Sequence, residues 1–121
     1  MSNPTPAELE ILQILWPLGE AKVKTINDRL CESKSVGYTT TLKTMQIMEQ
    51  KGLLGRKKDG KSHIYFPQTA QAETQKSMLD KLLESAFGGS KSRLIMQLLD
   101  SKKISKKELD EIQEFIKTME K

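Results

Sequence analysis

The side chains best suited to binding chemistry lie close together, between residues 34 and 61. This segment carries seven Lys/Arg against two Asp/Glu, whereas the whole 121-residue chain has a formal net charge of only +4. Short hydroxyls at a helix start favour contact with phosphate, long polar side chains reach base edges, and clustered cations attract any polyanion. The segment has all three kinds of residue, and it therefore predicts contact with nucleic acid.

Two adjoining elements carry most of these side chains. A helix is expected from Tyr38 or Thr39 to about Lys51, with Gly52 as the left-handed residue that ends it. A hairpin is expected next, with strands at 53–58 and 61–66 around an Asp59-Gly60 turn. The predicted DNA-binding residues are Lys24, Tyr38, Thr39, Thr40, Lys43, Gln46, Arg56, Lys57, Lys58 and Lys61.

The predicted helix has two different faces. At about 100° per residue, Thr41, Met45 and Met48 share one face, which predicts that this face packs on the core. The opposite face holds only polar residues apart from one, and its members are Thr39, Thr40, Lys43, Gln46, Gln50 and Ile47. The periodicity gives no reason for an isoleucine in that position.

Two further helices should precede this one. Thr5, Pro6 and Glu8 have the spacing of a capping box with proline at the first helical position, and the apolar stripe that follows ends near Pro17. A shorter helix is expected from Lys24 to Cys31. Trp16 is predicted to anchor the core and Cys31 to be a small buried residue.

Simpler readings compete with the functional ones. Lysines on a hairpin tip can merely keep an exposed strand edge soluble, but their coincidence with a polar helix face favours binding. His63 is expected to face solvent or the helix edge rather than contact phosphate. A catalytic pair of Cys31 and His63 would need an orienting third group and a pocket, so we predict no enzyme, no catalytic residue, no metal and no cofactor.

After Pro67 the pattern is purely helical. Segments of about 70–87, 90–101 and 105–120 are separated by Gly88-Gly89 and by a second capping box at Ser105 and Glu108. Their apolar stripes exceed what three short helices can bury among themselves, which predicts pairing with a second copy of the chain. The predicted dimerisation residues are Leu79, Leu82, Leu83, Leu94, Leu98, Ile112, Phe115 and Ile116.

These elements predict a mainly α fold with a small β-hairpin wing. We expect a winged helix-turn-helix DNA-binding domain over residues 1–68, followed by a helical dimerisation domain over 69–121. The single cysteine permits no intrachain disulfide, and no apolar run is long enough for a membrane span. The predicted location is therefore the cytoplasm, with no membrane as partner.

The quoted stretches "YTTTLKTMQIMEQKGLL", "RKKDGKSHIYFP" and "FGGS" resemble the penicillinase-repressor family of bacterial transcriptional regulators. The resemblance covers nearly the whole chain. It implies a homodimeric repressor whose winged helix binds a palindromic operator in double-stranded DNA while the C-terminal helices interlock. Carried over by position, Thr39, Thr40 and Lys43 would enter the groove, and Lys58 and Lys61 would lie on the wing.

Two departures from the family concern the inducing signal. Copper-responsive relatives carry a cysteine hook near the C-terminus, whereas Cys31 is the only cysteine here. Relatives that respond to β-lactams are cut at an Asn-Phe bond after the Gly-Gly-Ser break, where this chain has Gln97-Leu98. A sensor protease is a further partner that the resemblance allows. The alternative function is a winged-helix protein-interaction module without specific DNA binding.

Overall fold

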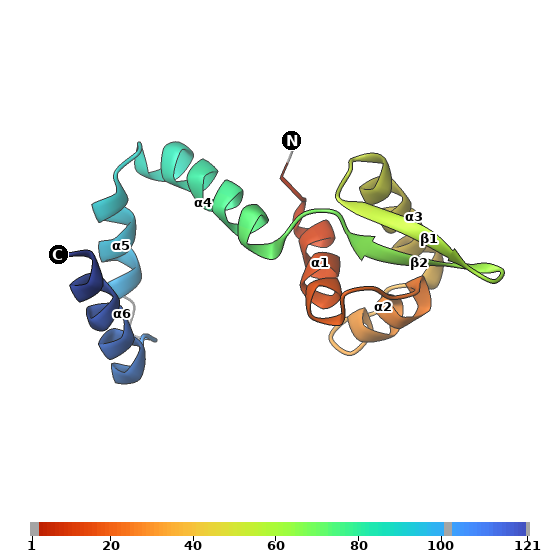
Figure 1. The fold of residues 1–121 in the computed structure, drawn as a ribbon, viewed down its shortest axis with the longest axis horizontal. Helices are drawn as coiled ribbons and strands as arrows, with labels where there is room; N and C mark the ends of the chain where they lie inside the picture. Colours follow the sequence, from red (N-terminus) through yellow and green to blue (C-terminus); the bar gives the residue numbers. More distant parts are fainter. Residues whose placement is uncertain (1–2, 101–102, 121) are drawn as a thin grey trace. The chain divides into compact units, whose positions relative to one another are not determined.

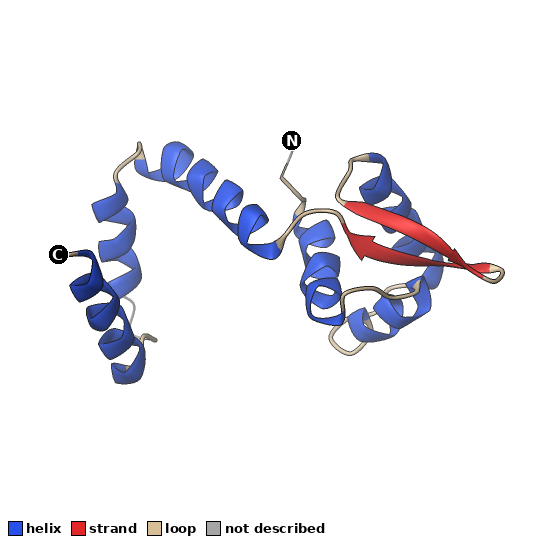
Figure 2. Cartoon of the chain, viewed as in Figure 1, coloured by secondary structure: helices blue, strands red, loops and turns tan. Residues whose placement is uncertain are grey.

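A computed structural model describes residues 3–100 and 103–120 of the chain. In chain order its elements are α1 (Pro6–Leu18), α2 (Val23–Leu30), α3 (Tyr38–Gln50), β1 (Leu54–Asp59), β2 (Ser62–Pro67), α4 (Gln71–Phe87), α5 (Lys91–Leu99) and α6 (Lys106–Met119) (Figure 1). The chain divides into two compact units, Met1–Met78 and Leu79–Lys121. The predicted fold class, mainly helical with one antiparallel hairpin, is confirmed (Figure 2).

The first unit has one hydrophobic core to which three helices and the hairpin all contribute. Its most deeply buried side chains are Ile11, Leu12, Leu15, Ile26, Met45, Met48, Leu53, Leu54 and Tyr65. Tyr65 also exchanges two backbone hydrogen bonds of 2.9 Å with Ala21, in the turn between α1 and α2. The base of the hairpin is therefore fixed to the helices, while its tip extends past them (Figure 1).

The predicted start of α1 is confirmed in detail. The Thr5 hydroxyl accepts a hydrogen bond from the Glu8 N–H at 3.2 Å, and the Glu8 carboxylate accepts one from the Thr5 N–H at 2.9 Å. The helix continues one residue past Pro17 and ends at Gly19, which has a φ of +82°. Pro17 donates no hydrogen bond to the ladder, but the helix still closes with a bond of 2.7 Å from the Gly19 N–H to the Leu15 carbonyl.

The end of α3 has the predicted glycine geometry. Gly52 has a φ of +85°, and its N–H donates to the Glu49 carbonyl at 3.1 Å. The N–H of Leu53 donates to the Met48 carbonyl at 2.9 Å, which completes a Schellman motif. This reversal carries the chain from α3 directly into Leu53 and Leu54, both buried in the core.

The hairpin turn lies one residue later than predicted. Asp59 pairs with Ser62, so the two-residue loop is Gly60-Lys61 and not Asp59-Gly60. A turn centred on Asp59-Gly60 would favour positive φ at both positions, and among the described residues only glycines have one, Gly60 with +64°. Glycine at the first loop position suits a type II′ turn, which places Lys61 at the tip.

Cys31 and Trp16 differ from the predicted core positions. The α2 helix ends at Leu30, which is buried, and Cys31 is exposed with its thiol donating to the Val36 carbonyl at 3.1 Å. Cys31 was wrongly predicted as buried because adjacent helical positions point about 100° apart. Trp16 packs against the edge of the core, and its indole N–H donates to the Thr69 carbonyl at 3.1 Å.

The second unit has almost no core of its own. Between residues 79 and 120, in the part that the structure describes, Leu94 alone is buried. The predicted capping box of Ser105 and Glu108 begins α6. The predicted end of the preceding helix at Ser101 lies outside the described residues. Large apolar side chains are exposed on all three helices: Leu79, Leu82, Ile95, Met96, Leu98, Phe115, Ile116 and Met119.

Candidate nucleic-acid interface

The polar face of α3 is exposed as predicted. Thr41, Met45 and Met48 are buried, whereas the exposed residues include Tyr38, Thr39, Thr40, Lys43 and Gln46. Gly37 at the N-cap makes no side-chain hydrogen bond to the first turn. The N–H groups at this end of the helix are therefore open to an anion.

A groove lies between α3, the start of α2 and the hairpin. Five of the ten predicted DNA-binding residues line it: Lys24, Tyr38, Gln46, Arg56 and Lys61. The structure thus brings together side chains from three elements that are separate in the sequence. Thr39, Thr40 and Lys43 are not part of the groove wall and lie on the exposed side of α3.

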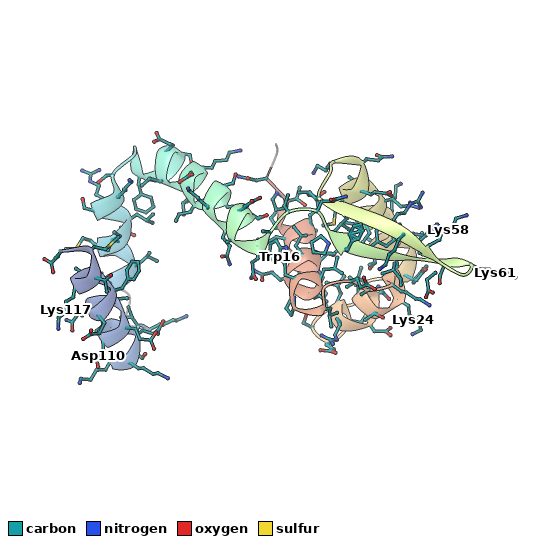
Figure 3. All side chains as sticks on the ribbon, in the orientation of Figure 1. Trp16, Lys24, Lys58, Lys61, Asp110 and Lys117 are labelled. Carbon is teal, nitrogen blue, oxygen red and sulfur yellow. The ribbon has the colours of Figure 1, made fainter. Side chains whose placement is uncertain are left out.

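The two faces of the hairpin differ in what they can reach. Residues paired across the strands share a face, so Arg56, paired with Tyr65, and Lys58, paired with His63, lie on the side of the core. Lys57, paired with Ile64, lies on the other side. Figure 3 shows Lys58 and Lys61 at the far end of the hairpin, with Lys24 near it on α2. Lys57 is therefore the predicted hairpin cation whose side chain lies on the face away from the groove.

The predicted cations fall into two groups by their partners. Lys24 pairs with Asp28 at 3.0 Å, Arg56 with Glu49 at 3.1 Å, and Lys57 with Glu20 at 2.9 Å. Within residues 3–100 and 103–120, no carboxylate lies within ion-pair distance of Lys43, Lys58 or Lys61. These three lysines can bind a phosphate without first breaking an ion pair within the protein. The paired ones are exposed, and such pairs contribute only about 0–1 kcal/mol.

Three residues of the site were not predicted. Lys22 and His63 also line the groove, and Lys22 pairs with Asp59 at 3.4 Å. Asn27 of α2 donates to the Val36 carbonyl at 3.0 Å and to the Thr41 hydroxyl at 2.8 Å, so it connects the preceding loop to the first turn of α3. The hydroxyl of a buried threonine needs a hydrogen-bond partner. Thr41 on the core face of the predicted helix was therefore the one sign in the sequence of a contact such as that with Asn27.

The other end of α3 is held by an ion pair in which only the carboxylate is buried. Glu8 is 4% exposed, and both of its carboxylate oxygens lie 2.9 Å from the Lys51 ammonium. Burial alone would raise the pKa of Glu8, but hydrogen bonds from Thr5 and the nearby charge of Lys51 outweigh it and lower that pKa. The N-terminus of α1 therefore anchors the C-terminus of α3.

The sequence of the chain is similar to those of known proteins. Residues 4–118 match the sequence profile of the family described as penicillinase repressor. The chain belongs to the penicillinase repressor family. The match confirms the resemblance drawn from the quoted stretches, and it extends through the second unit. The family's members are transcriptional repressors and not enzymes.

Individual relatives of this chain have low sequence identity to it, but their alignments cover most of its length. The penicillinase repressor of Bacillus licheniformis is 21% identical over 111 residues, which is 91% of this chain and 86% of that one. The methicillin resistance regulatory protein MecI of Staphylococcus aureus strain N315 is 20% identical over 91% of this chain and 89% of its own. An uncharacterised 16.5 kDa protein of Latilactobacillus sakei is 25% identical, over 93% and 77% of the two chains.

A solved structure shares the fold over part of the chain. The DNA-binding domain of the repressor BlaI, determined in solution, aligns with a TM-score of 0.53 and 20% identity. The alignment covers 58% of this chain and 85% of that domain. No described helix of this family member is long and apolar enough to cross a membrane.

Proposed function

We propose that this chain is a homodimeric transcriptional repressor that binds a palindromic operator in double-stranded DNA through α3 and the hairpin. One observation carries the proposal. Tyr38 and Gln46 of α3 line one groove together with Lys61 of the hairpin, which has no acidic partner in the described residues. The other polar side chains of α3 and Lys58 are exposed and are not needed for the core of the first unit. The proposal also has the support of family membership and of the winged fold.

In this proposal α3 lies in the major groove. Thr39 and Thr40 approach a phosphate beside the open helix N-terminus, whereas Lys43 and Gln46 are long enough to reach base edges. Lys58 and Lys61 contact the flanking backbone from the hairpin, with Arg56 and Lys24 in support. The backbone contacts position the protein, and the α3 contacts select the sequence.

In this proposal the second unit pairs two chains, so that each dimer carries two copies of this site. Large apolar side chains on α4, α5 and α6 are exposed in the described part of the unit. A two-fold dimer through these faces would bury them and would present two α3 helices to half-sites about 34–36 Å apart or a multiple of that. The operator would then be palindromic because the dimer is symmetric.

Binding of DNA at graded salt concentration tests the proposal. Sequences retained from a random DNA pool should share a palindrome, and affinity for it should fall steeply as salt rises because bound phosphates release counterions. A control oligonucleotide without the palindrome should bind weakly with a similar salt dependence. If the full chain retains no DNA even at low salt, the proposal fails and the protein-interaction module becomes the better account.

A further inference from the structure

Ile47 is an apolar residue within the polar surface of α3. All residues of this helix are described, and Ile47 is its only exposed aliphatic side chain, with 43% of its surface accessible. The other large aliphatic side chains of α3 are buried or half-buried: Met45 and Met48 lie in the core, and Leu42 packs against it. The fold therefore does not need Ile47 for its core.

Helix stability does not explain the residue either. A β-branched side chain loses rotamer freedom in a helix, so isoleucine at an exposed helical position gains neither burial nor propensity. Single exposed apolar residues are common on protein surfaces and need no explanation by themselves. Ile47 differs because of the position that it occupies.

Ile47 lies on the same side of α3 as Thr40 and Lys43. These residues are spaced i, i+3 and i+7, which places them in one row along the helix. The recognition helix of homeodomains contacts bases with residues spaced i, i+3, i+4 and i+7. If Lys43 faces base edges in the major groove, Ile47 faces the base edges one helical turn further along α3.

The chemistry of the major groove offers one apolar partner. Base edges there carry hydrogen-bond donors and acceptors, except for the 5-methyl group of thymine. An isoleucine makes no hydrogen bond, so that methyl group is the part of a base edge with which it can make a favourable contact. We infer that Ile47 is a specificity-determining residue that contacts the 5-methyl group of one thymine in each half-site, an inference that rests on the proposed function.

Replacing thymine by deoxyuridine tests this contact, because it removes the methyl group and leaves base pairing intact. Each thymine of the operator selected by the wild-type chain is replaced in turn, and the dissociation constant is measured. At one thymine in each half-site the wild-type affinity should fall about fourfold, the effect of one buried methyl group. Ile47→Ala should bind the thymine and deoxyuridine forms equally at that position.

Three further variants make the test specific. Ile47→Val should keep most of the discrimination, because it retains an apolar, β-branched side chain. Thr40→Ser removes the nearest competing methyl group in the row and should keep the discrimination as well. Leu18→Ala removes another exposed apolar side chain, at the end of α1, and should change neither affinity nor discrimination.

Several outcomes would overturn the inference. They are a wild-type chain indifferent to every replacement, a penalty that persists in Ile47→Ala, and a penalty that vanishes in Thr40→Ser. Failure of the proposed function would look different, because the wild-type chain would then retain no DNA from which to select an operator. That result would overturn both proposals, whereas the others leave the repressor function intact.

Discussion

The two compact units bury their apolar residues to very different degrees. In the first, eleven hydrophobic side chains form one buried cluster from α1, α2, α3 and the hairpin. In the second, among the residues described, Leu94 alone is buried and eight large apolar side chains are exposed. The first unit therefore has a core that leaves its polar surface free, whereas the second unit leaves apolar surface exposed that the proposed dimer would cover.

The largest predicted effect concerns the second unit. Phe115→Asp places a charge on the apolar side of α6, where dimerisation would bury it at a cost of several kcal/mol. We expect a monomer by sedimentation, with operator affinity reduced on the order of 10²–10⁴-fold because the two half-sites are no longer bound together. Leu98→Asp on α5 should have the same effect.

Gln113→Asp is the matched control for this prediction. It adds the same charge to an exposed polar position of α6 and should leave the protein dimeric. A fragment ending after Met78 should behave like Phe115→Asp, and it keeps the Trp16–Thr69 and Asn3–Ser77 hydrogen bonds that a fragment ending at residue 68 would lose. A monomeric wild-type chain, or a fragment that still dimerises, would show that the second unit is not the part through which the chain pairs.

The next effect tests how the first unit holds α3. Glu8→Gln keeps the capping geometry but removes the charge that Lys51 faces, and we expect a loss of about 1–3 kcal/mol of unfolding free energy. The loss is below that of a fully buried pair because the Lys51 side chain is 31% exposed. Lys34→Met, which breaks the exposed Lys34–Glu10 pair, is the control and should cost less than about 1 kcal/mol.

The pH dependence of this effect follows from the pKa of Glu8. That pKa is lower in the folded chain than its ordinary value of 4.5, so the pair stabilises fully above pH 4.5. The contribution is lost as pH falls below that value and through the folded pKa. Denaturation curves of wild type and Glu8→Gln should therefore converge on acidification, and a constant difference would contradict the assigned ion pair.

Local signals were enough to predict the elements, but not the contacts between them. The capping boxes at Thr5 and Ser105 and the glycine at 52 act within one or two turns, and all three are found as expected. The hairpin turn was misplaced because Gly60 can occupy either loop position, and strand pairing decides which. The Asn27–Thr41 and Glu8–Lys51 contacts join residues distant in the chain, so no spacing rule could predict them.

A smaller effect should separate base reading from positioning on the first unit. Lys43→Ala or Gln46→Ala should cost about 1–3 kcal/mol of binding free energy on operator and little on random DNA. Both residues are exposed, so the variants should fold as wild type does. Paired titrations on the two DNAs give the comparison, and equal losses on both for Lys43→Ala would show that this lysine contacts only the backbone.

The smallest predicted effect compares lysines within the hairpin itself. Lys58 and Lys61 have no acidic partner in the described residues, whereas Lys57 lies on the other face and pairs with Glu20. Lys58→Ala or Lys61→Ala should weaken binding to all DNA alike and reduce the slope of log affinity against log salt by about 1. Lys57→Ala should change that slope less, because the charge of Lys57 is already offset by Glu20 and its side chain lies on the face away from the groove. Titrations at four or more salt concentrations measure the slopes, and a loss for Lys57→Ala as large as for Lys58→Ala would mean that DNA contacts both faces of the hairpin.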